Sequence, residues 1–303
     1  MDSPPWRHHL LLAGGGHTHA LVLQRWLMRP RLRPAATRLT VVSRQGTLAY
    51  SGLVPAILAG LEPPSSGHLD WHRLCALADV SFVRAEITGL DPTARLLHLH
   101  GRPPLAYDRL SLDVGAVTLA APGEMAVKPL EPFLLWCGEG AVAEPRLRGG
   151  GASAVEVALA LRARGLRPRL LLRGTNLHLP SSAANRLAER LLQEAGIPVH
   201  RQVAAGEPAD LACTGSRAPA WLAAAGITVD PSSGRVLSAD TLEVVDHPGL
   251  FAAGDCALLR EDPRPPSGVW AVRAAPVLAR NLGRSLSDRP LVRWRPQRRA
   301  LQL

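Results

Sequence analysis

A glycine turn near the start of the chain restricts the possible folds more than any other feature. The segment "LLLAGGGHTHALVLQRW" reads as an apolar strand, His9–Ala13, three glycines, and a helix over His17–Met28. A second apolar strand follows at Arg38–Arg44. A strand, a glycine turn, a helix and another strand form a βαβ unit, in which the glycines let a nucleotide pyrophosphate approach the helix N-terminus. The segment therefore predicts a parallel sheet that binds a dinucleotide.

This first turn departs from the G-x-G-x-x-G pattern in two places. Gly14 and Gly16 take the first two glycine positions, but His19 takes the third. A small residue there normally lets helix and strand pack closely, so we expect the histidine to push them apart or to turn its ring aside. The acidic residue expected at the end of the second strand is also missing, because Ser43 and Arg44 stand there.

A second glycine turn, "RLRGGGASAVEVALALRARG", keeps the pattern more closely. Gly149 and Gly151 are followed by Ala154 at the third position, then by a helix that reaches Arg164. The strand "RPRLLLRG" comes next and ends near Arg173. An arginine there can accept a ribose 2′-phosphate, which favours NADPH over NADH.

The strand expected before this second turn has an unfavourable sequence. Pro145, Arg146 and Arg148 occupy positions where a buried strand should carry apolar side chains. Proline is rare in central strands because it cannot donate a ladder hydrogen bond. We therefore expect this strand to be degraded, and we expect nicotinamide binding to be less secure than binding at the first turn.

The remaining segments extend the α/β pattern. Three β-rich stretches, 80–91, 94–101 and 107–116, alternate with turn residues and predict a three-stranded meander. Near the end, "HPGLFAAGDCALL" predicts a strand that closes on Gly254–Asp255, and a helix is expected over Gly268–Leu286.

Composition narrows the function further. The net charge of +10 invites a nucleic-acid interpretation, but the basic residues are spread along the chain and Lys128 is the single lysine among 35 of them. No aromatic-interleaved signature accompanies them, so specific nucleic-acid binding is not expected. The four cysteines are far apart, which disfavours a metal site or a redox disulfide. With no signal peptide and no membrane-spanning run, we expect a cytoplasmic protein, at most peripheral on the inner membrane face.

Segments in family order along nearly the whole chain carry a resemblance to known flavoproteins. The chain resembles the pyridine nucleotide–disulfide oxidoreductase superfamily in its type II NADH dehydrogenase-like branch, and is most similar to the FAD-dependent module often fused to selenide, water dikinase. The segments are "GGGHTHALVL", "LTVVSRQGTLAYSGLVPAILAG", "YDRLSLDVGA", "VKPLEPFL", "GSRAPAWL", "HPGLFAAGDCA" and "RPQRRALQL".

The resemblance implies bound FAD and assigns a role to individual residues. The pyrophosphate would lie at Gly14, Gly16, His17 and Thr18; the adenosine at Ser43, Arg44, Glu86 and Ile87; the crossing between domains at Asp113–Gly115; and the ribitol and flavin at Ser51, Pro55, Gly254, Asp255, Val269 and Trp270. NADH or NADPH would lie at Gly149, Gly151, Ser153 and Arg173. Lys128, in the motif "VKPLEPF", would face the flavin or an acceptor, and is the candidate catalytic residue.

The predicted fold is therefore α/β, with two Rossmann-like dinucleotide-binding domains. An FAD domain is formed by residues 1–135 and 247–303, and a shortened NAD(P)-binding-like domain, residues 136–246, is inserted into it. The expected function is an FAD-dependent NAD(P)H dehydrogenase that passes electrons to a quinone or another small acceptor. The alternative is an FAD-binding pseudoenzyme or partner module of selenophosphate metabolism, associated with selenide, water dikinase and without NAD(P)H turnover.

Overall fold

The computed structural model describes residues 6–139 and 142–297. The last residues of the motif "RPQRRALQL", from position 298 on, and Gly140 and Ala141 lie outside the described residues. The chain forms two compact units. The first takes Met1–Leu48, Leu69–Ala116 and Arg217–Leu303, and the second takes Ala49–His68 and Val117–Ser216. The second unit is thus inserted, in sequence, into the first.

These units divide the chain differently from the predicted domains. Residues 217–246 belong to the first unit, whereas residues 49–68 and 117–135 belong to the second. Segment 217–246 belongs to the first unit because its apolar side chains join that unit's core: Leu222 and Val236 pack in one cluster with Leu11 and Leu110.

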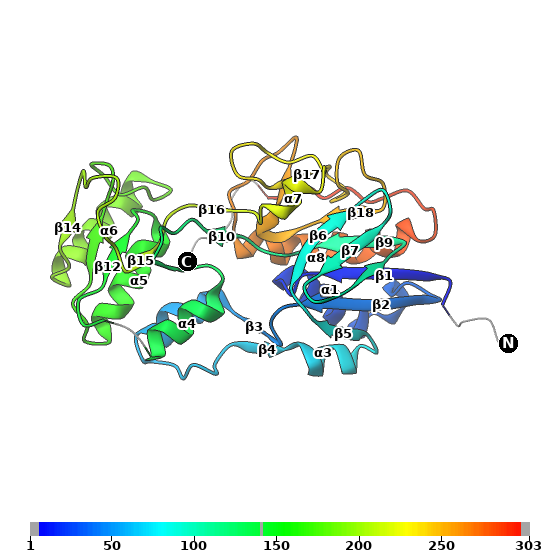
Figure 1. Cartoon of the computed structure of the whole chain (residues 1–303), viewed down its shortest axis with the longest axis horizontal. Helices are drawn as coiled ribbons and strands as arrows, with labels where there is room; N and C mark the ends of the chain where they lie inside the picture. The colour runs from blue at the N-terminus through cyan, green and yellow to red at the C-terminus, as the bar shows by residue number, and fades with distance from the viewer. Residues whose placement is uncertain (1–5, 140–141, 298–303) are drawn as a thin grey trace. The chain divides into compact units, whose positions relative to one another are not determined.

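A five-stranded parallel sheet organises the first unit (Figure 1). Its order is β18-β9-β1-β2-β5, with bounds Leu250–Ala252, Arg109–Leu112, His8–Ala13, Thr37–Ser43 and Ser81–Arg84. The chain runs from β1 outward to β2 and β5, then returns to the other side of β1 with β9 and β18. The strand order therefore reverses beside β1. In parallel α/β sheets this switch point is where ligands bind, outside the carboxyl ends of the strands.

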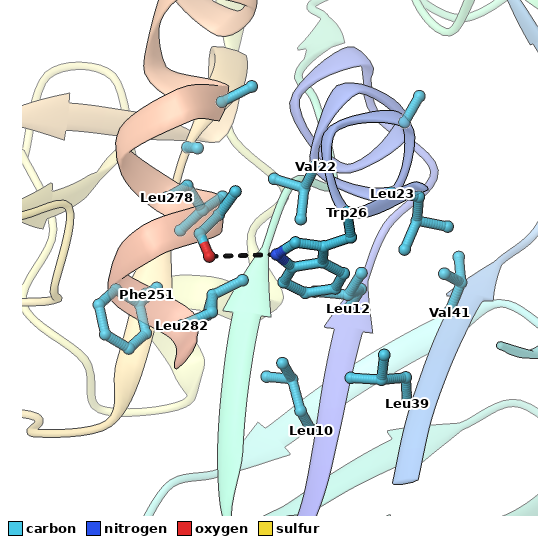
Figure 2. Close-up of a cluster of buried hydrophobic side chains, with 14 of the residues drawn as sticks. Leu10, Leu12, Val22, Leu23, Trp26, Leu39, Val41, Phe251, Leu278 and Leu282 are labelled. Carbon is cyan, nitrogen blue, oxygen red and sulfur yellow. Dashed lines mark hydrogen bonds between the residues drawn. The ribbon is translucent and has the colours of Figure 1, made fainter. Parts of the chain in front are cut away.

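Side chains alternate between the two faces of β1, as the twofold period of a strand requires. Leu10 and Leu12 pack against the helices α1 (His17–Met28) and α8 (Gly268–Ser285). Figure 2 shows Trp26 of α1 in this cluster, donating its indole N–H to the carbonyl oxygen of Ala279 in α8 at 3.2 Å. The two helices are thereby fixed side by side over the sheet.

The other face of β1 is covered by an antiparallel sheet. Leu11 and Ala13 share a core with β6 (Ile87–Asp91), β7 (Leu96–Leu99) and β8 (Arg102–Ala106). This is the expected meander, but its strands are not the expected ones. Residues 81–84 and 109–112 were assigned to it, and both instead pair in the parallel sheet. Periodicity missed this because a short apolar strand reads alike in either sheet.

The remaining elements of the first unit are short. They are the helices η1 (Pro30–Leu32), α3 (Trp71–Leu77), α7 (Trp221–Ala224) and η3 (Gly254–Cys256), and the parallel pair β17 (Val236–Ser238) and β19 (Ala257–Leu259). Near the limits of the units lie the pairs β3 (Thr47–Ala49) with β4 (His68–Asp70), and β10 (Val117–Thr118) with β16 (Ser216–Arg217).

The second unit repeats the design of the first. Its parallel sheet has the order β11-β15-β12-β13-β14, with bounds Met125–Ala126, Leu211–Ala212, Arg146–Arg148, Arg169–Leu171 and Val199–His200. The order again reverses, this time beside β12. Its helices are η2 (Ser51–Leu53), α2 (Val54–Leu58), α4 (Leu130–Glu139), α5 (Ala152–Ala163) and α6 (Ser182–Glu194). In the part of the chain that the structure describes, no helix combines the length and apolarity needed to cross a bilayer.

Candidate dinucleotide-binding sites

Three glycines surround one residue, Asp113, at the switch point of the first sheet. Gly14 follows β1, Asp113 follows β9, and Gly254 follows β18. A Cβ atom on Gly14 would lie 2.2 Å from the carbonyl oxygen of Asp113, and one on Gly16 or Gly254 would lie 2.2 Å from its Oδ1. Gly14 and Gly254 also have positive φ angles of 106° and 69°. Only glycine fits these three positions, because Asp113 lies so close to the turn before α1.

Asp113 is almost completely buried, at 3% exposure, and faces that N-terminus. Its Oδ2 accepts the backbone N–H of His19 at 3.1 Å. Burial, together with the nearby charge of Asp255, raises the pKa of Asp113 to about 7, against the opposing effect of hydrogen bonds from His19 and Thr18. The loop thus encloses a carboxyl group that titrates near neutral pH.

His19 fills the space between the turn and β9. Its Nδ1 lies 2.8 Å from the carbonyl oxygen of Gly14, and its Nε2 lies 2.8 Å from the hydroxyl of Ser111. A carbonyl can only accept, so Nδ1 carries the proton and Nε2 accepts from Ser111. Complete burial lowers the pKa of His19 to about 4, so the ring is neutral. The histidine at the third position therefore bonds turn and sheet together.

Other predicted FAD contacts lie around this loop. Thr18 donates its hydroxyl to the carbonyl oxygen of Ala271 at 3.2 Å, which ties the first turn of α1 to that of α8. Arg44, just beyond β2, forms an exposed ion pair with Glu86 at 3.8 Å. His17 is the first residue of α1, Ser43 the last of β2 and Ile87 the first of β6, Gly115 lies two residues after Asp113, and Asp255 lies in η3.

The N-terminus of α8 is capped within the chain. The hydroxyl of Ser267 accepts the N–H of Val269 at 3.3 Å, and its carbonyl accepts the N–H of Trp270 at 3.0 Å. These two N–H groups therefore already have partners. What the helix offers a neighbouring anion is the positive end of its dipole.

The glycine turn of the second unit has the same backbone construction. Gly149 has a φ of 147°, and a Cβ there would lie 2.4 Å from the carbonyl oxygen of Cys213. The N–H of Gly149 bonds Leu171 at 3.1 Å, as that of Gly14 bonds Val42 at 2.8 Å. Gly151 begins α5 in open space, and Ser153 and Arg173 are exposed.

The strand before this turn corrects our expectation. We expected a degraded strand, but β12 is regular and pairs with both β13 and β15. Pro145 lies just outside it, and only Leu147 points into the core. Arg148 pairs with buried Glu124 at 2.6 Å, and Arg146 with Asp210 at 3.1 Å. Each charged side chain thus has an acidic partner, which the local sequence does not reveal.

Three predicted flavin contacts belong to the second unit. Ser51 is exposed in η2, and Pro55 lies in α2. Lys128 is half-buried, and its backbone exchanges hydrogen bonds with Thr118: its N–H donates to the hydroxyl at 3.2 Å and its carbonyl accepts from the N–H at 3.1 Å. The roles assigned to these residues stay predictions, as do those of the other contacts.

The residues that hold the first loop together were not predicted from the sequence. Asp113 was placed at a domain crossing, and Ser111 was not singled out. A polar residue within an otherwise apolar strand, as in "LSLDVG", is the signal that could have found them. All four cysteines are buried free thiols, and burial raises the pKa of each to about 12. In residues 6–139 and 142–297, no three metal-ligating side chains come together.

Comparison with known proteins establishes the fold. No protein-family model and no curated protein matches the sequence. Among solved structures, NADH:rubredoxin oxidoreductase from Clostridium acetobutylicum is similar with a TM-score of 0.78, 14% identity, 98% of this chain and 79% of that one. The water-forming NADH oxidase from Lactobacillus brevis, bound to NADH, is similar with a TM-score of 0.75 and 17% identity, and the match covers 95% of this chain and 71% of that one. For sulfide:quinone oxidoreductase from Aquifex aeolicus the TM-score is 0.69 and the identity 17%, and the match covers 93% of this chain and 78% of that one.

These similarities confirm the predicted fold class. The chain has the α/β fold with two Rossmann-like domains that these oxidoreductases share. The likeness to the pyridine nucleotide–disulfide oxidoreductases is one of fold, and the predicted link to selenide, water dikinase stays a prediction.

Proposed function

We propose that the chain is an FAD-dependent NAD(P)H dehydrogenase. The observation that carries this proposal is the repeated turn: in each unit a strongly positive-φ glycine closes on the backbone of a neighbouring strand end, at a switch point, before a helix. One such turn fits one dinucleotide. Two of them suit a protein that binds both a flavin and a nicotinamide nucleotide, and the L. brevis neighbour is described as bound to NADH.

The first turn fits FAD. Gly16 begins α1 without a side-chain cap of its own, and the side chain beside this helix N-terminus is Asp113, whose carboxyl accepts the N–H of His19. Gly14, Gly16, His17 and Thr18 would hold the pyrophosphate, while Ser43, Arg44 and Glu86 would lie by the adenosine. The dipole of α8 would stabilise negative charge on the flavin. FAD would supply the redox chemistry, taking a hydride from NAD(P)H and releasing electrons to a quinone or another acceptor.

The second turn would hold NADH or NADPH at Gly149, Gly151 and Ser153. The exposed guanidinium of Arg173, beyond the end of β13, could accept a 2′-phosphate and so favour NADPH. The alternative, an FAD-binding module without NAD(P)H turnover, depended partly on a degraded strand before this turn. Because β12 is regular, that argument is weakened, and we favour the dehydrogenase.

An anaerobic titration tests the proposal. The purified full chain, supplied with FAD, should show flavin absorption and should bleach on addition of NADPH, and less readily with NADH. Yellow protein that neither nucleotide bleaches, but dithionite does, would support the module without turnover. Protein that cannot be loaded with FAD would contradict both.

Matched variants separate the two turns. Gly149→Val places a side chain against the carbonyl of Cys213 and should abolish bleaching by NADPH, while bound FAD and its reduction by dithionite remain. Arg173→Ala, at an exposed position, should weaken reduction by NADPH more than reduction by NADH. If Arg173→Ala changes both equally, the assigned nucleotide preference is wrong. Electron acceptors, quinones and small iron–sulfur proteins included, can then be compared by reoxidation rate.

A further inference from the structure

A small cavity in the first unit contains a buried cation without a counter-ion. The cavity has a volume of about 40 Å³ and lies among β17, β18, β19 and the first turns of α8. Arg235 lines it and is only 9% exposed. Within residues 6–139 and 142–297, Arg235 forms no ion pair with a carboxylate; its Nη1 donates to the backbone carbonyl of Arg264 at 2.7 Å, and its Nε has no hydrogen-bond partner. A buried charge without a counter-ion destabilises the folded chain, and a bound anion would remove this cost.

A second buried polar group on this cavity also lacks a hydrogen-bond partner. Ser238, three residues further along the same strand region, is 1% exposed and also lines the cavity. Its Oγ has no hydrogen-bond partner among the described residues. Buried polar atoms are nearly always paired, so two unpartnered donors on one cavity indicate a missing acceptor. Since one acceptor can serve both donors, a bound oxyanion would account for both observations.

The surroundings of the cavity are electropositive. The N-terminal residues of α8, Ser267 and Trp270, form part of the wall, and a helix of 18 residues places the positive end of its dipole there. Arg264 lines the wall as well, with its guanidinium 5.2 Å from the ring centroid of Trp270, but its charge is paired with Asp262 at 2.6 Å. Opposing this, Asp230 and Asp255 act on Arg235 only through space.

The volume limits the size of the ligand. A single water molecule needs roughly 10–15 Å³ on this measure, so the cavity holds about three waters or one small polyatomic ion. A nucleotide or a peptide is far too large.

We propose that this cavity is a binding site for one small inorganic oxyanion of the size of phosphate or sulfate, held by the Arg235 guanidinium and the Ser238 hydroxyl. The cavity is not lined by Gly14, Gly16, His17 or Thr18, but its wall includes Gly254 and Trp270, which the proposed function assigns to the ribitol and flavin, so it adjoins the proposed FAD site. Because the ligand binds the folded chain, it stabilises it by mass action.

The test measures thermal unfolding and calorimetric binding of the full chain, with and without added FAD, in phosphate, sulfate or chloride at constant ionic strength. Phosphate or sulfate should raise the unfolding midpoint saturably, whereas chloride should not. Ser238→Ala should weaken binding about tenfold or more, the expected loss for a hydrogen bond to a charged group. Arg235→Gln should abolish the rise.

Arg33→Gln is the matched control. Arg33 is also partly buried and also bonds a backbone carbonyl, that of Asp79 at 2.8 Å, but it does not line the cavity. Its variant should keep the full response. Should Arg235→Gln fail to fold, Ser238→Ala and Arg235→Lys decide the question.

Two results would overturn the proposal. One is the absence of a saturable response, in which case water fills the cavity. The other is an equal response in wild type and Ser238→Ala, which would place the ion elsewhere, for example at the glycine turn. Saturation of the turn with FAD removes phosphate binding there, and flavin absorption reports independently whether FAD is bound.

Discussion

The two glycine turns share a backbone but are stabilised by different means. In the first, side chains hold the loop: Asp113 fills the space beside Gly16, and His19 bridges the turn to Ser111. In the second, Gly151 begins its helix in open space, and a plain alanine, Ala154, takes the third position. In the second unit, the ion-paired arginines Arg146 and Arg148 lie on β12, the strand before the turn. The comparison teaches that a deviant motif can mark the more constrained site.

The largest difference should appear when the same glycine is replaced in both turns. Gly16→Ala puts a methyl group into the carboxyl of Asp113, and we expect a loss of more than about 3 kcal/mol in the free energy of unfolding. Gly151→Ala at the equivalent position meets no neighbour and should cost less than about 1 kcal/mol. Urea unfolding of both variants measures the difference. Equal losses would show that the two loops are equally open.

Much of this architecture was predictable because its signals are local. Both turns, both helices that follow them, and α8 end within a residue or two of their predicted limits. The regular β12 was not predictable, because Glu124 and Asp210 lie 24 and 64 residues from their arginine partners in the chain. The cluster around Asp113 was hidden for the same reason: its glycines follow strands that are far apart in sequence.

The next largest effect should follow removal of the histidine at the third position. His19→Ala deletes a buried ring and leaves the Ser111 hydroxyl without its acceptor, which should cost about 3 kcal/mol. Ser111→Ala removes only the hydrogen bond and should cost about 1 kcal/mol. If the ring merely fills space, the double variant will lose the sum of the two single losses. A loss clearly below that sum, measured by chemical unfolding, supports the bridge.

A smaller effect is expected at the ion pairs of the second unit. Glu124→Gln leaves Arg148 without a counter-ion at a site where the two side chains are 15% and 4% exposed, and should cost about 2 kcal/mol. Asp210→Asn removes the partner of Arg146 at a more exposed site and should cost under about 1 kcal/mol. Thermal unfolding compares the two. Neither change should disturb FAD bound at the first turn, and loss of flavin from Glu124→Gln would contradict the separation of the two turns.

The smallest effect concerns pH and the first turn, where the buried His19 and Asp113 have pKa values of about 4 and about 7. Burial lowers the pKa of His19 from 6.5 to about 4, so the unfolded chain takes up this proton first. Its stabilising contribution is complete above pH 6.5 and is lost as the pH falls towards 4. Burial raises the pKa of Asp113 from 3.8 to about 7, so here the folded chain keeps the proton longer. Its contribution is complete below pH 3.8 and is lost as the pH rises towards 7.

The two groups therefore have opposite effects on the pH dependence of the free energy of unfolding between about pH 4 and 6.5. In Asp113→Asn, only the effect of His19 should remain. Asparagine keeps an oxygen that can accept the His19 N–H but cannot titrate. Relative to wild type, the variant should gain at least about 1 kcal/mol in stability between pH 4 and 7, measured by urea unfolding at each pH. Asp255→Asn, which removes a charge near Asp113 but keeps its carboxyl group, should show a much smaller gain. A stability difference between Asp113→Asn and wild type that does not change with pH would mean that Asp113 is already ionised at pH 4, and the loop would then hold a permanent negative charge beside the proposed pyrophosphate site.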